Sequence, residues 1–227
     1  MSKDLHLNQL ASNNDQTPNW RIKTWFPDLE DKTLEQLTKY FSELQKFNKV
    51  VNLISAKTLL HADAIHFADS MLSARIVSKK VNKSVYLYDL GCGNGFPGLV
   101  YAIMYPDQKM CLMDSDERKC EFLKHISDTL GLSNVIVQTK KIDTLPSNTI
   151  EQAICRGFAP LPKALLTLRK AVKKGAVVYH MKSEEWALEV SQIPSQLCSM
   201  WQPELESEYK LPIGDIKMFV VKTTKIA

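Results

Sequence analysis

The spacing of apolar and polar residues changes near residue 80. Before that point apolar residues recur at helical intervals, which predicts an amphipathic helix running to about Asn48 and a second helix from about Thr58 to Val77. Thr33 and Gln36 have the spacing of a capping box at the start of the first helix. After residue 80 short apolar runs alternate with amphipathic stretches. We therefore expect an N-terminal helical extension, residues 1–80, followed by an α/β domain, residues 81–227.

The apolar runs in the second part predict strands that alternate with helices. The expected strands lie near residues 85–88, 110–114, 134–137, 152–155 and 176–181. Ser115 is expected to cap the helix after the second strand, and basic residues before Gly175 predict a helix over Leu161–Lys174. Two last strands, near 201–210 and 216–222, are joined by a segment too short for a parallel crossover, so they are expected to form an antiparallel hairpin. The predicted fold is a mostly parallel, Rossmann-like sheet that ends in an antiparallel hairpin.

Composition narrows the class of protein. The chain has 227 residues, is 44% hydrophobic and carries a net charge of +4 that is spread evenly. Any nucleic-acid contact must therefore come from local patches rather than from a strong overall field. The five cysteines form no C-x-x-C pair and no spacing typical of a metal site, as expected of reduced thiols. Without a signal peptide or a run near the ~20 apolar residues of a membrane span, we expect a cytoplasmic protein with no membrane partner.

The segment Asp89–Gly98 carries the clearest chemical signal. It follows the apolar run Val85–Tyr88 and reads as a strand, a glycine turn and a helix start. Its spacing also fits a dinucleotide fingerprint, with Asp114 as the ribose-binding acid. Asp89 favours S-adenosylmethionine over a dinucleotide, because a carboxylate beside a pyrophosphate is unfavourable. The terminal hairpin independently favours a methyltransferase. We expect the strand-tip acid and the loop glycines, Asp89, Gly91, Gly93 and Gly95, to hold the cofactor.

Other candidate residues lie where the predicted strands end. Asp114 is placed to bind both ribose hydroxyls, or alternatively to cap the next helix. The loop after the third strand, which contains Lys141 and Ile142, is expected to cover the adenine ring, although the lysine side chains themselves fit a solvated pair. Arg156 and Lys182 end the fourth and fifth strands, where a cation can clamp an RNA phosphate or stack on a base. For both, a surface ion pair explains the sequence equally well.

The acceptor is inferred by exclusion. No [Asn/Asp]-Pro-Pro-[Tyr/Phe] run, typical of exocyclic-amine methylation, follows the fourth strand. Cys155 is positioned for pyrimidine C5 chemistry, but it ends an apolar strand and fits an inert buried thiol better. What remains is an acceptor that needs neither a base nor a covalent adduct. Guanine N7 is such an acceptor, because its lone pair carries no proton.

The chain resembles the bacterial small-subunit ribosomal guanine-N7 methyltransferase family, also called glucose-inhibited division protein B. The resemblance rests on the segments Phe47–Ser55, His66–Ser70, Gly95–Gly98, Leu112–Ser115 and Arg156–Ala159. It implies methyl transfer from S-adenosylmethionine to N7 of a guanine in 16S ribosomal RNA, with the small ribosomal subunit as partner and neither DNA nor a metal. The residues it places at the cofactor are Gly91, Phe96, Lys141, Ile142 and Arg156. Those it places around the methyl-transfer cleft are Asn48, His66, Asp69 and Lys182.

Three segments depart from the family pattern, and two other functions stay open. Cys92 replaces the usual Ser or Thr, His180–Ser183 stands where A-x-K-G is common, and the adenine loop lacks the usual R-x-E arrangement. A nicotinamide-dependent oxidoreductase would use Asp114 for a dinucleotide. A non-catalytic ribosome assembly factor would keep the fold without turnover.

Overall fold

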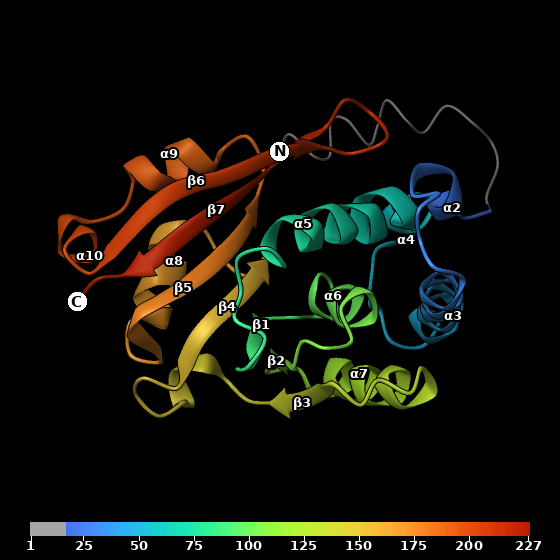
Figure 1. The fold of residues 1–227 in the computed structure, drawn as a ribbon, viewed down its shortest axis with the longest axis horizontal. Helices are drawn as coiled ribbons and strands as arrows, with labels where there is room; N and C mark the ends of the chain where they lie inside the picture. The colour runs from blue at the N-terminus through green and yellow to red at the C-terminus, as the bar shows by residue number, and fades with distance from the viewer. Residues whose placement is uncertain (1–16) are drawn as a thin grey trace.

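A twisted sheet of seven strands forms the centre of the computed structural model, which describes residues 17–227 (Figure 1). The strand order is β3-β2-β1-β4-β5-β7-β6, parallel from β3 to β5 and antiparallel at β7 and β6. The strands are β1 (Leu87–Leu90), β2 (Met110–Asp114), β3 (Val135–Thr139), β4 (Ile150–Arg156), β5 (Val172–Lys182), β6 (Trp201–Lys210) and β7 (Lys217–Lys225). The predicted Rossmann-like sheet with a terminal antiparallel hairpin is confirmed.

Helices cover both faces of the sheet. On one face lie α2 (Ile22–Trp25), α3 (Asp31–Asn48), α4 (Ala56–Leu59), a π-helical turn (Asp63–Ala68), α5 (Asp69–Val77), α6 (Gly98–Met104) and α7 (Glu117–Thr129). On the other lie a 3₁₀ turn (Ile142–Thr144), α8 (Leu161–Leu168), α9 (Trp186–Ser191) and α10 (Ser195–Cys198). Alternate strand residues feed the two cores: Leu112 packs in the first, Cys111 and Met113 in the second. None of the described helices is long and apolar enough to cross a lipid bilayer.

The helices before residue 81 share one continuous core with the sheet. Aromatic rings link the layers: Trp20 stacks on Phe41 at 4.7 Å between ring centroids and lies edge-on to Phe67 at 4.9 Å. Phe67 in turn lies edge-on to Phe96 of the glycine loop at 5.0 Å. Such pairs stabilise by roughly 0.5–1.5 kcal/mol each beyond the area they bury. The first helical layer therefore supports the glycine loop directly, with no break in packing near residue 80.

Two predicted helix caps are wrong. Thr33 lies inside α3, which begins at Asp31 after Glu30, and Gln36 donates instead to the backbone oxygen of Leu130 at 2.9 Å. Helix α7 is capped by Asp116, not by Ser115, because the Asp116 carboxylate accepts from the amide of Lys119. The cap positions are taken by Glu30 and Asp116, and local spacing does not distinguish these residues from Thr33 and Ser115.

The predicted helix over Leu161–Lys174 is too long. Helix α8 ends at Leu168, and β5 already begins at Val172. Gly175 has a φ of +82° inside this strand, opposite a register shift against β4 between Ile150 and Gln152. The glycine therefore accommodates a bulge in the sheet, and it does not end a helix.

Candidate active site at the carboxyl edge of the sheet

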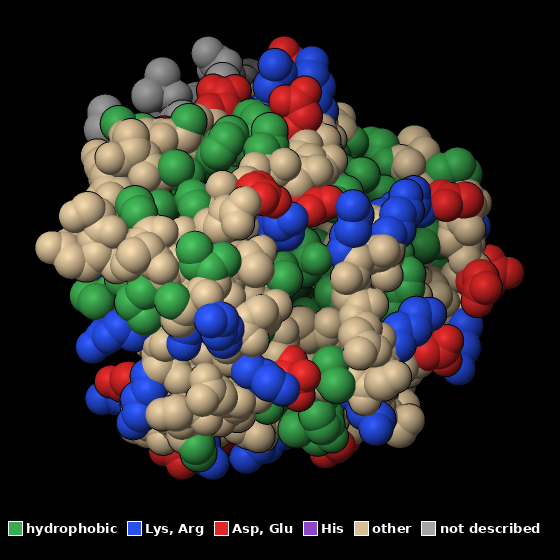
Figure 2. All heavy atoms as spheres, turned by 60° about the vertical axis from the view of Figure 1, so that its left-hand side comes forward, with side chains coloured by type: hydrophobic (Ala, Val, Ile, Leu, Met, Phe, Trp, Pro, Cys, Tyr) green, Lys and Arg blue, Asp and Glu red, His purple; other side chains and the backbone are tan. Residues whose placement is uncertain are grey.

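A cleft of about 1200 Å³ opens over the carboxyl ends of the parallel strands. It lies where the strand order reverses between β1 and β4, which is where ligands bind in open α/β sheets. The residues that line it include the glycine loop with Asp114, the loop 140–143, the ends of β4 and β5 and the β6–β7 turn, together with Ile65 and His66 of the π-helical turn and residues of α8 and α9. Figure 2 shows Lys and Arg side chains scattered among acidic and neutral ones on one face, in agreement with the even charge of the sequence.

The glycine loop leaves room for a ligand at one position and none at another. Gly91 and Gly93 have φ of +67° and +54°, a region that other residues rarely adopt. A Cβ on Gly91 would lie 2.8 Å from Phe158 Cδ2, whereas a Cβ on Gly93 would meet no atom within 4 Å. Gly93 lines the cleft, as do Gly91 and Phe96; Gly95 does not. The free space at Gly93 allows a cofactor to approach the backbone closely.

Asp89 lies beneath this loop and does not line the cleft. It is fully buried, and its Oδ2 accepts from the amide of Gly98 at 2.7 Å, which joins the strand to the first turn of α6. Its Oδ1 has no hydrogen-bond partner in the described chain. Burial raises the pKa of Asp89 to about 7. Its position supports a role in holding the loop, rather than the direct cofactor contact predicted from the sequence.

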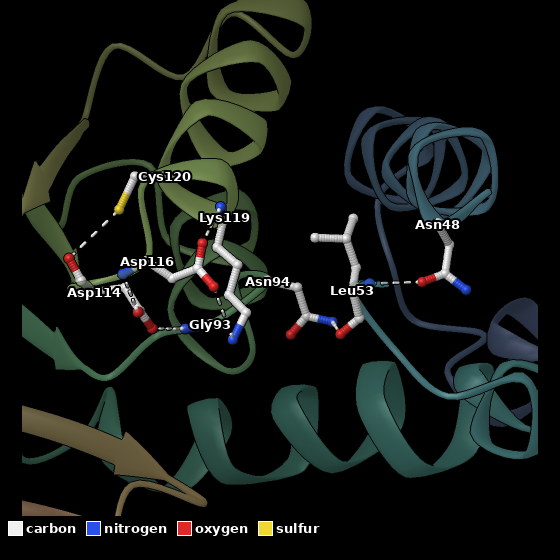
Figure 3. A network of polar contacts seen from close by, with 8 residues as sticks. All are labelled: Asn48, Leu53, Gly93, Asn94, Asp114, Asp116, Lys119 and Cys120. Atoms are coloured by element: carbon white, nitrogen blue, oxygen red, sulfur yellow. Dashed lines mark hydrogen bonds and ion pairs between the residues drawn. The ribbon is translucent and has the colours of Figure 1, made fainter. Parts of the chain in front are cut away.

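Asp114 connects the second strand to the glycine loop (Figure 3). Its Oδ2 accepts from the amide of Gly93 at 2.8 Å and its Oδ1 from the amide of Asp116 at 2.9 Å. A carboxylate has about four acceptor sites, so capacity for ribose hydroxyls remains at the cleft. The residue therefore fixes the loop and also lines the cleft, and its contact with a ribose stays a prediction. Lys141 and Ile142 also line the cleft, directly after β3.

Arg156 is the centre of a buried polar network at the end of β4. Its Nη1 donates to Asp69 Oδ2 at 2.8 Å and to the oxygen of Ile65 at 3.0 Å, and its Nη2 donates to His66 Nδ1 at 3.0 Å. The guanidinium also lies 5.4 Å from the ring centre of Phe96. His66 and Asp69 are thus brought together through a shared contact with Arg156. His66 and Arg156 line the cleft; Asp69 lies fully buried behind them.

Tyr209 completes this network from β6 and was not predicted from the sequence. Its hydroxyl donates to Asp69 Oδ1 at 2.7 Å, across 140 positions of chain. Burial and the neighbouring Asp69 raise the pKa of Tyr209 well above its usual value. No local sequence signal marks this residue, because the contact exists only once the hairpin has joined the sheet.

Asn48 does not line the cleft. Its Oδ1 accepts from the amides of Leu53 and Ile54, each at 2.8 Å, and so shapes the loop between α3 and α4. That loop is joined to the glycine loop, since Asn94 Nδ2 donates to the oxygen of Leu53 at 3.2 Å (Figure 3). Asn48 is thus connected to the glycine loop through the backbone of Leu53.

Lys182 lines the cleft on the side away from the glycine loop. Its Nζ donates to Glu189 Oε2 at 2.6 Å and to the oxygen of Ala159 at 2.9 Å. The same Glu189 oxygen accepts from the amide of Leu161 at 2.7 Å, which ties α9 to the start of α8. The ion pair that the sequence left open for Lys182 is therefore present, but inside the cleft. Glu189 was not predicted.

Cys155 lies in a buried chain of hydrogen bonds. Its Sγ is 3.1 Å from His180 Nδ1, and His180 Nε2 is 2.9 Å from Thr223 Oγ1. Burial raises the pKa of Cys155 to about 12 and lowers that of His180 to about 3. A thiol that holds its proton this firmly is a poor nucleophile at neutral pH, in agreement with the predicted inert role.

Comparison with known proteins assigns the chain to a family. The family model described as GidB, rRNA small subunit methyltransferase G, matches residues 33–207. A Bdellovibrio bacteriovorus protein named ribosomal RNA small subunit methyltransferase G 3 is 50% identical, over 92% of this chain and 94% of its own length. A Paracoccus denitrificans protein named ribosomal RNA small subunit methyltransferase G is 34% identical, over 76% of this chain and 86% of its own.

Solved structures agree on the fold. A SAM-dependent methyltransferase from Aquifex aeolicus superposes with a TM-score of 0.53 at 16% identity, covering 81% of this chain and 97% of its own. A predicted O-methyltransferase from Agrobacterium tumefaciens gives 0.55 at 17% identity, covering 70% and 81%. With its glycine loop, its Arg156 network and a family match that spans most of its length, this chain belongs to the rRNA small subunit methyltransferase G family.

Proposed function

We propose that this chain transfers the methyl group of S-adenosylmethionine to N7 of a guanine in 16S ribosomal RNA, acting in the cytoplasm on the small ribosomal subunit. The observation that carries the proposal is the burial of Cys155, the thiol at the end of β4, whose Sγ lies against His180 in the core and is therefore not available for a covalent adduct. Guanine N7 has a lone pair and no proton to lose, so it needs orientation and electrostatic support rather than a base.

The residues present fit S-adenosylmethionine. Gly93 leaves an open cradle, Asp114 offers acceptors for ribose hydroxyls, and Ile142 supplies an apolar surface beside the adenine-binding loop. Two of the five N–H groups of Arg156 have no partner in the described part of the chain, so they are free for a carboxylate or a phosphate. When bound, S-adenosylmethionine supplies an electrophilic methyl group: the N7 lone pair forms the new C–N bond while the bond to sulfur breaks and its electron pair stays on sulfur.

The protein's own contribution is to fix donors before the substrate arrives. Asp69 and His66 hold the Arg156 guanidinium in one orientation, so no reorganisation is needed at the moment of reaction. Asp69, buried behind Arg156, balances its charge. Arg156 at one side of the cleft and Lys182 at the other then bracket the space in which the two reactants meet.

The test is tritium transfer from labelled S-adenosylmethionine to small-subunit RNA, offered naked and as assembled subunits, followed by cleavage chemistry specific for N7-methylguanine. One labelled, cleavable site is expected. Label without cleavage would overturn the N7 acceptor. Binding of NADH without S-adenosylmethionine would favour an oxidoreductase, and subunit binding without label would favour an assembly factor.

A matched pair of variants tests the site. Arg156→Lys removes the forked donor geometry and is expected to lower kcat at least 100-fold. Arg75 provides the control, because it makes the same kind of contact, an ion pair to Asp28 at 2.7 Å with its guanidinium 5.1 Å from the ring of Phe26, but does not line the cleft. Arg75→Lys is expected to leave kcat unchanged; equal losses in both variants would contradict the role of Arg156.

A further inference from the structure

Methylation at N7 does not by itself select guanine. Adenine has the same N7 lone pair, so an enzyme of this kind must read another part of the base. The two purines differ on the Watson–Crick edge, where guanine presents an O6 acceptor followed by N1–H and N2–H donors, and adenine presents an N6–H donor followed by an N1 acceptor. A site that selects guanine therefore needs a donor and an acceptor side by side.

Glu189 and Lys182 form such a pair in the cleft. The Lys182 ammonium has three donors, of which Ala159 and Glu189 use two. Glu189 accepts from Lys182 and from the amide of Leu161 through Oε2, and its Oε1 has no hydrogen-bond partner within residues 17–227. One unused donor thus lies beside one unused acceptor, held together by a contact of 2.6 Å.

The position of this pair fits an acceptor base. Asp114, Asp143 and Glu189 are the carboxylates of the described chain that line the cleft. Asp114 belongs to the glycine-loop network, and Asp143 lies in the loop expected at adenine, which leaves Glu189 as the carboxylate away from the cofactor side. Its side chain is 21% exposed, so it is open to a ligand yet sheltered enough for its charge to count.

Apolar side chains also line the cleft. Leu211 and Ile216 come from the β6–β7 turn, which is closed by a bond from the Leu211 amide to the Ile216 oxygen at 2.9 Å. Ile65 packs against the small core cluster that contains these two residues, and Met181 precedes Lys182 on β5. Flat apolar surfaces beside a small number of polar groups are what a base removed from its stack requires.

We propose that Glu189 and Lys182 read the Watson–Crick edge of the target guanine, Lys182 donating to O6 and Glu189 Oε1 accepting from N1–H and N2–H; this rests on the proposed function. Adenine would place a donor against the ammonium and a lone pair against the carboxylate, so it is rejected at both positions. The guanine becomes positively charged as N7 gains the methyl group, and the negative charge of the Glu189 carboxylate stabilises it.

The test compares Glu189→Gln with Glu185→Gln. A glutamine at 189 keeps an oxygen for the amide of Leu161 and for Lys182, but replaces the second acceptor with a donor. Glu185 is exposed at the start of the same helix and does not line the cleft, so its variant is the matched control. The probes are GMP, IMP and AMP, titrated by ligand-observed NMR into protein saturated with S-adenosylhomocysteine.

The wild-type chain and Glu185→Gln are expected to bind GMP at least tenfold more tightly than AMP, with IMP between them because it lacks the N2 amine. Glu189→Gln is expected to lose at least tenfold in GMP affinity and to bind GMP and AMP within about threefold, with unchanged affinity for S-adenosylhomocysteine. An intact GMP preference in Glu189→Gln would overturn the proposal.

Subunit methylation gives the second measurement and separates the two proposals. Glu189→Gln is expected to lower kcat/KM for small subunits by about 10- to 100-fold relative to Glu185→Gln, as expected for hydrogen bonds to a charged group. If GMP binds too weakly to measure, wild-type rates in Glu189→Gln overturn the assignment. A Glu189-dependent GMP preference without any subunit methylation would instead keep the guanine site and reject the proposed reaction.

Discussion

Replacing Tyr209 by phenylalanine tests whether the C-terminal hairpin stabilises the site it completes. The change removes one hydroxyl that donates to the buried carboxylate of Asp69 at 2.7 Å. A hydrogen bond to a charged group contributes about 1.5–3 kcal/mol, and no packing atoms besides the oxygen are lost. We expect the free energy of unfolding to fall by about 2 kcal/mol, which corresponds to a decrease in Tm of roughly 4–8 °C for a chain of this length.

The assay is urea unfolding followed by circular dichroism, in a double-mutant cycle with Asp69→Asn. Once the carboxylate charge is gone, the hydroxyl should contribute only about 1 kcal/mol, so a coupling of about 1 kcal/mol is expected. Tyr86→Phe is the matched control: Tyr86 is 37% exposed, and its loss of a hydroxyl should change stability by less than about 0.5 kcal/mol. Equal costs for Tyr209→Phe with and without the Asp69 charge would refute the reasoning.

Three other predictions concern buried groups and the glycine loop. The folded-state pKa of Asp89, about 7, lies above its unfolded value, so its contribution to stability is lost as pH rises from about 4 to 7. Across that window the stability of Asp89→Asn should rise relative to the wild type, by at most about 1.4 kcal/mol per pH unit. A pH-independent difference in unfolding free energy between the two would contradict this. Cys155→Ser should keep methyl transfer, because the buried thiol holds its proton. In native protein, a thiol reagent at pH 8 should label exposed Cys198 before Cys155, as mapped by mass spectrometry. Early labelling of Cys155 would show that it is accessible. Gly93→Ala should bind S-adenosylhomocysteine at least tenfold more weakly in calorimetry, because the added Cβ points into the open cleft. The positive φ of this position should also cost about 1–2 kcal/mol of stability. Unchanged affinity would remove Gly93 from the cofactor site.

The sheet could be predicted because its signals are local. Each parallel strand contains a short apolar run and is followed by a turn or a helix start, and the brief Leu211–Gly214 segment forces the last pair to be antiparallel. The end of α8 could not be predicted, since a basic stretch followed by Gly175 is compatible with a helix end and with a bulged strand. Only the pairing with β4 decides between them.

The site was predictable where a residue follows a strand and unpredictable where two distant segments meet. Asp114, Arg156 and Lys182 all lie at the strand ends where they were expected. Tyr209 and Glu189 act through partners brought close by the hairpin and by α9, and no local pattern marks them. Asp89 shows a different limit. The sequence identifies the correct strand tip, but only the burial of the side chain shows that its carboxylate contacts the glycine loop.

Strand β7 lies between β5 and β6, although it follows both in the chain. During synthesis, β5 therefore has an open edge until residues 217–225 have emerged, and β6 has no strand to pair with. Tyr209 can reach Asp69 only after that insertion, so the Arg156 network is among the last features to form as the chain leaves the ribosome. A nascent chain that stops short of β7 has its glycine loop and yet lacks a finished reaction centre.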